Sequence, residues 1–224
     1  MYNIKILNKI QEAELLYSLQ LLAPEEIYKK YKIPGQYGVF SPEKNDSIYL
    51  AFSNAPLKKE PILEILVKDE GKNAQEILSL KPNDVLNLSD IQGKGFNLDR
   101  LKNQSIEAFA MGSGIAPIRA LIQSILEGLI SVKTFKLWMC AFTKNHVPYK
   151  NEFIFWKSIF PVELVLDQEH PYKNVIDVLK ESKDDYSEKR VLWIGSKQFG
   201  IDLWNVLQQK GLSKENFLTN YENS

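Results

Sequence analysis

The sequence is poor in the residues that form disulfides and metal sites. Its 224 residues include one cysteine, Cys140, and two histidines, His146 and His170. A single cysteine excludes an intramolecular disulfide, a four-cysteine zinc site and a cysteine-held iron–sulfur cluster. Two histidines are too few for a histidine-rich metal centre, and both lie in polar loops typical of the surface. We therefore expect no metal and no cluster in this chain.

Long hydrophobic runs and an excess of one charge are missing too. The longest apolar run is Leu137–Phe142, whereas a membrane-spanning helix needs roughly 20 residues. The residues Met1–Ile6 lack the apolar core of a signal peptide. The 28 basic residues balance the 28 acidic ones, which removes the attraction that sequence-independent nucleic-acid binding requires. These absences predict a cytoplasmic protein without a membrane span or a nucleic-acid partner.

The first hundred residues are typical of an antiparallel β-structure. Hydrophobic residues make up 44% of the chain and charged residues 25%, as in ordinary globular proteins. Short apolar segments recur at a spacing of about ten residues between turn formers, which favours a small barrel or sandwich. A helix is predicted at Ala74–Leu80. The strands are expected at Ile4–Lys9, Glu14–Leu21, Gln36–Phe40, Ile48–Ser53, Ile62–Val67 and Val85–Leu88.

After Asn103 the pattern changes to strands that alternate with helices, which predicts a parallel α/β sheet. We therefore predict two domains, residues 1–103 and residues 104–224. The second-domain strands are expected at Ile106–Met111, Thr134–Phe142, Val162–Leu166, Arg190–Ile194 and Asn216–Tyr221. Its helices are expected at Ile115–Leu129, Asn151–Ile159, Val175–Lys180 and Gln198–Gln209, the last one stopped by Gly211.

The segment Met111–Pro117 carries the clearest chemical signal. A strand, two glycines and a helix follow one another, so main-chain N–H groups at the helix start can receive a phosphate. Pro117 stands where the dinucleotide fingerprint has a third glycine, and a tight turn without a ligand fits this segment equally well. The next strand ends without a carboxylate for a ribose hydroxyl. Lys144 stands there instead and suggests a 2′-phosphate, with a solvated surface lysine as the alternative.

Several motifs in a fixed order resemble those of the ferredoxin–NADP⁺ reductase superfamily over nearly the whole chain. The likeness is strongest to the electron-transfer subunits of dihydroorotate dehydrogenase and to plant and bacterial reductase-like proteins. The resemblance implies a flavin-binding barrel followed by an NAD(P)-binding α/β domain. The motifs that carry it are Ile33–Tyr37, Leu50–Pro56, Gly71–Ala74, Gly93–Phe96, Gly112–Pro117 and Trp193–Phe199, with Tyr221 near the end of the chain.

The resemblance also implies which residues hold each ligand. FAD is expected as the cofactor, with FMN left open, and NADPH or NADH as the co-substrate. The nucleotide is assigned to Gly112, Ser113, Gly114, Ile115, Ala116, Pro117, Lys144, Gly195 and Ser196. The flavin is assigned to Gln36, Tyr37, Leu50, Ala51, Phe52, Ser53, Asn54, Lys68, Gly71, Asn73, Ala74 and Tyr221.

Three positions depart from the superfamily pattern. Ile48 stands where an arginine ordinarily neutralises the flavin phosphate, and Ala51 stands where a serine ordinarily bonds near flavin N5. Ile194 replaces the cysteine of the family's Cys-Gly-Pro strand end, and Cys140 lies in an apolar strand as an inert core thiol. The start of the Gly71–Ala74 segment, with Lys68 and Lys72 to supply positive charge, is the expected substitute for the missing arginine.

Two functions follow from the resemblance and its departures. The first is a flavin-dependent oxidoreductase that takes hydride from NAD(P)H and passes electrons to an acceptor. Because the chain carries no cluster cysteines, a one-electron acceptor would be a separate protein, and a small-molecule acceptor is equally open. The alternative is a non-catalytic flavin- or nucleotide-binding partner protein on the same fold.

Overall fold

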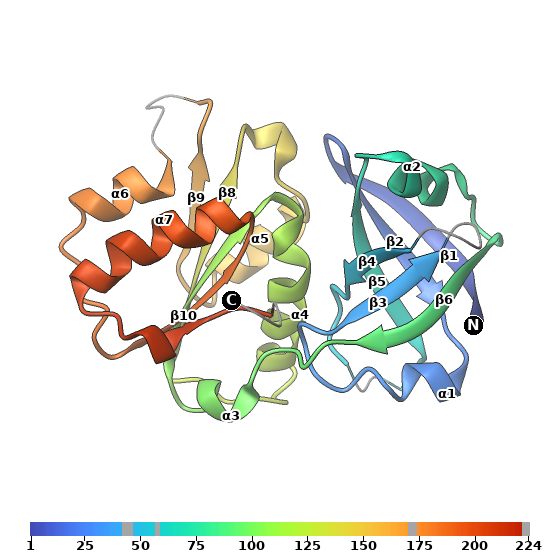
Figure 1. Cartoon of the computed structure of the whole chain (residues 1–224), viewed down its shortest axis with the longest axis horizontal. Coiled ribbons are helices and arrows are strands. Elements are labelled where there is room, and N and C mark those ends of the chain that lie inside the picture. The colour runs from blue at the N-terminus through green and yellow to red at the C-terminus, as the bar shows by residue number, and fades with distance from the viewer. Residues whose placement is uncertain (42–46, 57–58, 170–173, 221–224) are drawn as a thin grey trace. The chain divides into compact units, whose positions relative to one another are not determined.

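The computed structural model describes all residues except 42–46, 57–58, 170–173 and 221–224 (Figure 1). Two compact units make up the chain. Unit 1 contains Met1–Phe96, Ala116–Leu129 and Asn220–Ser224, and unit 2 contains Asn97–Ile115 and Ile130–Thr219. The domain boundary at residue 103 stays a prediction. No helix in the described ranges is both long and apolar enough to span a bilayer.

Unit 1 is built on an antiparallel sheet of six strands in the order β4-β3-β6-β1-β2-β5. A bridge between Phe52 and Ile65 joins the two ends of the sheet and closes it into a barrel, as the sequence predicts. Its helices are α1 (Glu25–Tyr28) and α2 (Lys72–Ser79). Its strands are β1 (Tyr2–Ala13), β2 (Leu16–Leu22), β3 (Tyr37–Ser41), β4 (Ile48–Ala51), β5 (Ile62–Lys68) and β6 (Val85–Gln92).

Two of the local differences from the sequence prediction in unit 1 have a clear physical reason. The second strand begins at Leu16 and not at Glu14, because Leu15 takes a φ of 60° in the tight turn between β1 and β2. Helix α1 has four residues, a single turn that is too short to produce a helical hydrophobic pattern. Neither difference changes the barrel.

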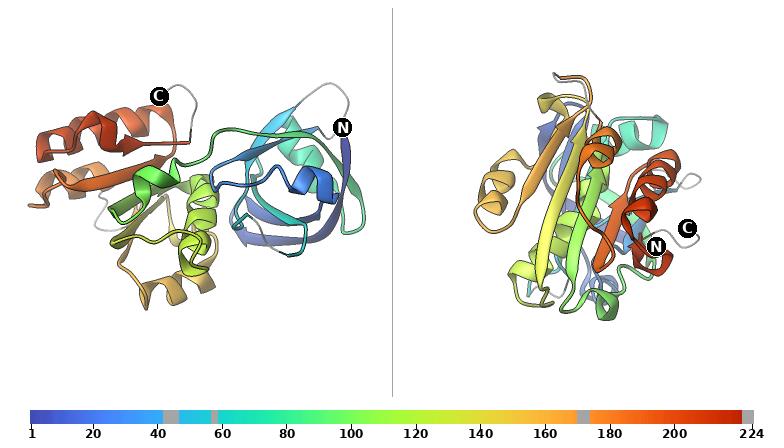
Figure 2. Two further views of the ribbon diagram at one scale, coloured as in Figure 1. Left: turned by 90° about the horizontal axis from the view of Figure 1, so that it is seen from below. Right: turned by 90° about the vertical axis from the view of Figure 1, so that its left-hand side faces the viewer.

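Unit 2 contains a parallel sheet of five strands in the order β11-β10-β7-β8-β9, which confirms the predicted α/β architecture. Helices α5 and α7 cover opposite faces of this sheet (Figure 2). The strands are β7 (Ser105–Met111), β8 (Thr134–Ala141), β9 (Val162–Leu166), β10 (Lys189–Ile194) and β11 (Phe217–Leu218). Its helices are α3 (Leu98–Leu101), α5 (Lys150–Lys157), α6 (Val175–Glu181) and α7 (Lys197–Leu207). Helix α4 (Ile115–Leu126) belongs to unit 1 from Ala116 onward.

The strand order of unit 2 reverses at β7. The chain runs from β7 to β8 and β9 on one side, and then returns to place β10 on the other side of β7. In open α/β sheets, ligands bind outside the carboxyl ends of the strands at this kind of reversal. The carboxyl ends of β7 and β10 are therefore where a nucleotide site is expected.

One buried carboxylate lies inside unit 2. Glu107 on β7 is 6% exposed and accepts hydrogen bonds of 2.9 Å each from Trp138 Nε1 and Tyr186 Oη. Lys189 forms an ion pair with the same carboxylate. Burial and the neighbouring carboxylate raise the pKa of Tyr186, so the hydroxyl stays a donor. Because these partners satisfy Glu107, it serves the packing of the sheet.

Candidate functional site

Two of the recognised motifs pack against each other in unit 1. The turn at Pro34 and Gly35 meets the loop that contains Gly95 and Phe96, and Phe96 N donates to Pro34 O at 2.8 Å. Gly95 has a φ of 65°, and a Cβ there would lie 2.8 Å from Pro34 O. Glycine is therefore required at position 95 for the two motifs to pack against each other.

The side chain of Gln36 holds this junction in place. Its Oε1 accepts hydrogen bonds from the main-chain N–H groups of Lys32 at 2.8 Å and Ile33 at 3.0 Å. Its Nε2 donates to Gly93 O at 3.2 Å. These bonds occupy both ends of the amide, so Gln36 acts as a positioning residue for the loop. Asn220 Nδ2 also reaches this turn, while Tyr221, the next predicted flavin residue, lies outside the described residues.

The pairing of β3 with β4 decides which side chains face the core. Phe40, which is fully buried, lies opposite Ile48, and Gly38 lies opposite Leu50. Directly opposed residues share one face of a sheet. Ile48 and Leu50 therefore point to the core, where both pack against its cluster of buried side chains. Leu50 can reach a ligand only through its main chain.

The other face of the same strand pair carries Tyr37, Tyr49 and Ala51. The rings of Tyr37 and Tyr49 meet edge to face with centroids 5.8 Å apart, and Tyr49 is 64% exposed. Sequence reasoning did not select Tyr49, although the alternation of side chains along a strand provides the signal. An exposed aromatic ring beside a residue without a bulky side chain offers a surface for a planar ligand.

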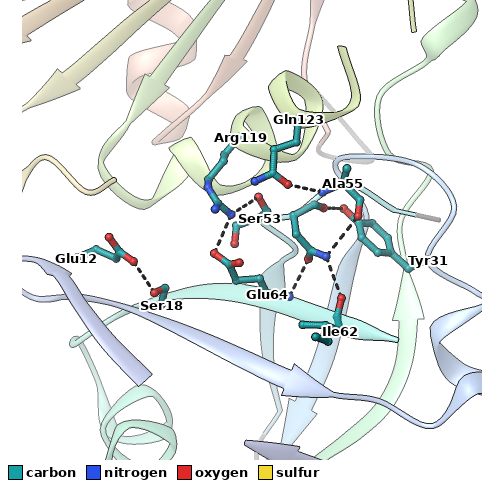
Figure 3. A network of polar contacts seen from close by, with 10 residues as sticks. Glu12, Ser18, Tyr31, Ser53, Ala55, Ile62, Glu64, Arg119 and Gln123 are labelled. Carbon is teal, nitrogen blue, oxygen red and sulfur yellow. Dashed lines mark hydrogen bonds and ion pairs between the residues drawn. The ribbon is translucent and has the colours of Figure 1, made fainter. Parts of the chain in front are cut away.

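The turn after β4 is held by side chains of α4 (Figure 3). Arg119 Nη1 donates to Ser53 O at 2.9 Å and to Glu64 Oε1 at 2.7 Å. Gln123 Oε1 accepts from Ala55 N at 3.0 Å. Arg119 is 7% exposed, so its ion pair with Glu64 is buried. This network fixes the main chain of the predicted flavin turn.

Three residues of that turn, all predicted to contact the flavin, differ in what they can offer. Phe52 is fully buried, and the centroids of its ring and the Tyr31 ring lie 4.5 Å apart. Only the main chain of Phe52 could therefore contact a ligand. The side-chain amide of Asn54 already bonds within the protein: its Oδ1 accepts from Glu64 N at 2.8 Å, and its Nδ2 donates to Ile62 O at 2.9 Å. Ser53 is fully buried, and among the described residues no group lies within hydrogen-bond distance of its Oγ. A buried hydroxyl without a partner is uncommon, so Ser53 is the residue of this turn with bonding capacity left.

The start of α2 presents open main-chain N–H groups. Gly71 precedes the helix with a φ of 83°, is exposed, and has no atom within 4 Å of the place where a Cβ would stand. No side chain caps the helix, and its first turn holds no acidic residue. Asn73 is half-buried beside it, Ala74 packs in the core, and Lys68 pairs with Glu70. Unpaired N–H groups and the helix dipole suit an anion at this position.

In unit 2 the predicted phosphate loop follows β7 as a 3-10 turn, Gly112–Gly114, which leads into α4. Gly112 has a φ of 55°, and no atom lies within 4 Å of its missing Cβ. A Cβ on Gly114 would lie 2.6 Å from Ile194 O, so this glycine allows the loop to touch β10. Ser113 is half-buried between them. Ile115, Ala116 and Pro117 are buried, so only their main chain could face a ligand.

The end of β10 lies beside the phosphate loop. Ala110 pairs with Ile194 in the sheet, and a Cβ on Gly195 would lie 3.1 Å from Met111 Cβ. Ser196 caps α7, and its Oγ accepts a bond of 3.1 Å from Phe199 N. The structure thus brings the predicted residues Gly112–Gly114, Gly195 and Ser196 together at the point where the strand order reverses.

Lys144, the predicted 2′-phosphate contact, has a carboxylate neighbour. Its main-chain N donates to Glu169 Oε1 at 2.6 Å, and its Nζ lies 3.5 Å from Glu169 Oε2. The lysine side chain is 75% exposed. A 2′-phosphate would have to compete with Glu169 for this cation. Sequence reasoning missed this pair, because 25 positions separate the two residues.

A pocket of about 210 Å³ opens in unit 2 at the carboxyl ends of β7, β8 and β9 and the starts of α6 and α7. Asp167 lies in its wall, and burial raises the pKa of that carboxyl. Cys140 also contributes, but it is 2% exposed and burial raises the pKa of its thiol, which makes it unreactive. The lining residues are Met111, Cys140, Asp167, Asn174, Val175, Ile176, Ser196, Gln198, Phe199 and Asp202.

Metal ligands do not gather anywhere in the part of the chain that the structure describes: no three His, Cys, Asp or Glu side chains lie close enough to hold an ion. His146 Nδ1 lies 2.8 Å from Thr143 Oγ1, and His170 lies outside the described ranges.

Comparison with known proteins finds matches to solved structures but none at the level of sequence. No protein-family model matches the sequence, and no curated protein matches it. Among solved structures, a ferredoxin NADP⁺ reductase from Neisseria gonorrhoeae with bound FAD and NADP superposes with a TM-score of 0.81 at 15% identity, covering 97% of this chain and 96% of that one. A Plasmodium falciparum ferredoxin-NADP⁺ reductase with 2′P-AMP gives 0.78 at 15% identity, covering 96% and 94%.

The chain has the fold of a ferredoxin–NADP⁺ reductase. Phthalate dioxygenase reductase, which is described as transferring electrons from pyridine nucleotides to [2Fe-2S], gives a TM-score of 0.74 at 17% identity and covers 97% of this chain and 67% of that one. These likenesses confirm the resemblance that the motifs predict at the level of the fold. At such identities the likeness shows the fold, and the ligand assignments stay predictions.

Proposed function

We propose that this reductase-like protein is a flavin-dependent oxidoreductase that oxidises NAD(P)H and delivers the electrons to an acceptor. The observation that carries the proposal is the glycine loop Gly112–Gly114, which lies against the end of β10 where the strand order reverses. That loop stands in a chain with the fold of reductases that bind FAD and NADP. The superfamily resemblance supplies the reaction type.

The residues of unit 1 fit a flavin at three points. Tyr49 and Tyr37 offer an aromatic surface, Ser53 Oγ is a buried group that lacks a partner among the described residues, and the start of α2 offers main-chain donors for a phosphate. A bound flavin would supply a group that accepts two electrons as hydride and releases them singly. The barrel would hold that group, and the Arg119 network would keep its turn rigid.

Tyr49 provides a test of the flavin surface. Replacing Tyr49 with alanine is expected to weaken FAD or FMN binding by up to about tenfold, because a stacked aromatic contact contributes roughly 0.5–1.5 kcal/mol. Tyr49→Phe keeps the ring and should bind as the unchanged chain does. Titration of each flavin into the deflavinated protein measures the effect. Equal affinities for all three proteins would remove Tyr49 from the site.

The electron acceptor is proposed to be outside this chain. With one cysteine in the sequence, a cluster of the kind that phthalate dioxygenase reductase serves cannot be held by cysteines of this chain. A separate electron-carrier protein or a small molecule would receive the electrons. We propose FAD as the cofactor, with FMN as the second choice, because the neighbours include a structure with FAD.

An absorption spectrum tests the proposal directly. The purified protein, or the protein reconstituted with FAD or FMN, should show flavin absorption that bleaches when NADH or NADPH is added without oxygen. Re-admitting oxygen or an artificial acceptor should restore the absorption. A protein that binds flavin and nucleotide but never bleaches would contradict the proposed activity.

A second function, a non-catalytic binding partner, is favoured by one group of observations. Ile48 faces the core, Ala51 has no polar side chain, and Ile194 replaces the cysteine of the resembling motif. Each of these three departures removes a side chain that the superfamily pattern assigns to the flavin or the nicotinamide. Nucleotide binding without flavin reduction would support this function in place of the oxidoreductase.

A further inference from the structure

The pocket of unit 2 begins at the proposed phosphate loop. Met111, which lines it, directly precedes Gly112, and Ser196, which also lines it, follows Gly195. Its lining also includes Asp167, the residue immediately after β9. The pocket therefore extends from the loop at the strand reversal across the carboxyl ends of the neighbouring strands. A dinucleotide with its pyrophosphate on the loop has this space beside it.

The polar groups of this pocket are acceptors and neutral donors. Asp167 and Asp202 contribute carboxylates, and Asn174, Ser196 and Gln198 contribute uncharged polar side chains. No Lys, Arg or His occurs among the described residues that line it. Such a lining bonds well to hydroxyl groups, which donate to carboxylates, and it repels a phosphate, which carries the same sign of charge.

We infer that this pocket receives the adenosine ribose of the coenzyme and selects NADH over NADPH. The inference rests on the proposed function, because it assumes that the loop Gly112–Gly114 binds the pyrophosphate. In dinucleotide-binding sheets a carboxylate at a strand end near the phosphate loop bonds to the ribose 2′-hydroxyl. The sequence shows no such carboxylate after β8, whereas the fold supplies one from the end of β9.

Asp167 is placed firmly for this role. Its main-chain N donates to Ala141 O at 3.0 Å, which extends the pairing of β8 and β9 by one residue. Asp167 is half-buried, and this burial raises the pKa of its carboxyl. A hydroxyl donor would restore part of the solvation that burial removes, whereas a 2′-phosphate would add a second negative charge beside the carboxylate.

Lys144 does not offset this selection. It is not among the residues that line the pocket, and its side chain pairs with Glu169. The cation at the end of β8 therefore gives the pocket no positive charge.

Isothermal titration of NADH and NADPH into the purified full chain tests the inference without relying on turnover. NADH is expected to bind at least about tenfold more tightly than NADPH. Asp167→Asn should reduce the ratio to about threefold or less, mainly by strengthening NADPH binding, and Asp167→Asn with Asp202→Asn should reduce it further. Asp184→Asn, which removes an exposed carboxylate outside the pocket, should leave the ratio unchanged.

The possible outcomes separate this inference from the function on which it rests. Equal or tighter binding of NADPH by the unchanged chain overturns the selection and leaves the proposed oxidoreductase in place. A preference for NADH that persists in both variants, with circular dichroism showing that they are folded, also overturns it. If neither coenzyme binds, the inference and the proposed function fail together.

Discussion

Replacing Arg119 with methionine is expected to lower the free energy of unfolding by about 3–5 kcal/mol, because the change leaves a buried carboxylate without its partner. The Arg119 and Glu64 side chains are 9% and 12% exposed, and Nη1 and Oε1 lie 2.7 Å apart. The same nitrogen donates to Ser53 O at 2.9 Å, so the turn after β4 also loses a support. Urea denaturation, with the slope checked for two-state behaviour, measures the loss.

Two matched variants show whether the buried pair is the cause. Arg100→Met removes an exposed arginine and should change stability by less than about 0.5 kcal/mol. Replacing Arg119 with methionine and Glu64 with leucine together removes both charges and should recover much of the loss, since apolar substitutes for a buried pair are often tolerated. If Arg119→Met costs no more than Arg100→Met, the ion pair does not stabilise the turn.

The Arg119 pair also links stability to the proposed flavin site. Its loss should loosen Ser53–Ala55, where Ser53 Oγ lacks a partner among the described residues. A site positioned less well binds its ligand less tightly, so flavin affinity should fall in Arg119→Met and recover only in part when Glu64 is also replaced. The unfolding free energy reports the effect of the buried charge, and the flavin affinity reports the positioning of the turn.

The sequence predicted the architecture of both domains because each has its own periodicity. Alternation and turn residues indicate the barrel, and strands that alternate with helices indicate the parallel sheet. The glycine motifs were also readable, and the structure supplies the physical reason. Gly95 and Gly114 stand where a Cβ would collide with neighbouring main chain, so a sequence signal at these positions reflects backbone contact.

The sequence could not show how each motif residue is used. Gln36 and Asn54 lie in motifs predicted to contact the flavin, yet their side-chain amides form hydrogen bonds with main-chain groups of the protein. Alternation along β4 indicates the face on which Tyr49 lies, but its ring contact with Tyr37 depends on the register of β3 and β4, which a single sequence does not fix. The acidic pocket depends on Asp167 and Asp202 coming together from separate elements. Such pairings appear only when the chain is folded.

Ser113→Glu is expected to weaken NADH and NADPH binding by about a hundredfold. A carboxylate within a few ångströms of a pyrophosphate costs roughly 2.7 kcal/mol at the effective dielectric of a protein surface, which corresponds to that factor. Ser113 is the suitable position because it is half-buried in the middle of the loop. Gly114 is less suitable, since a side chain there would lie 2.6 Å from Ile194 O and would disturb the packing itself.

The matched control is Ser113→Gln, which has the size of glutamate without its charge. If the loop binds phosphate, the glutamine variant should lose only a few-fold in affinity, and the difference between the two variants should shrink as salt screens the charge. Thermal denaturation should give the same midpoint for both, because the side chain projects from a turn. Equal coenzyme affinities for the glutamate and glutamine variants would mean that Gly112–Gly114 is a tight turn without a phosphate, and the nucleotide would have to bind elsewhere.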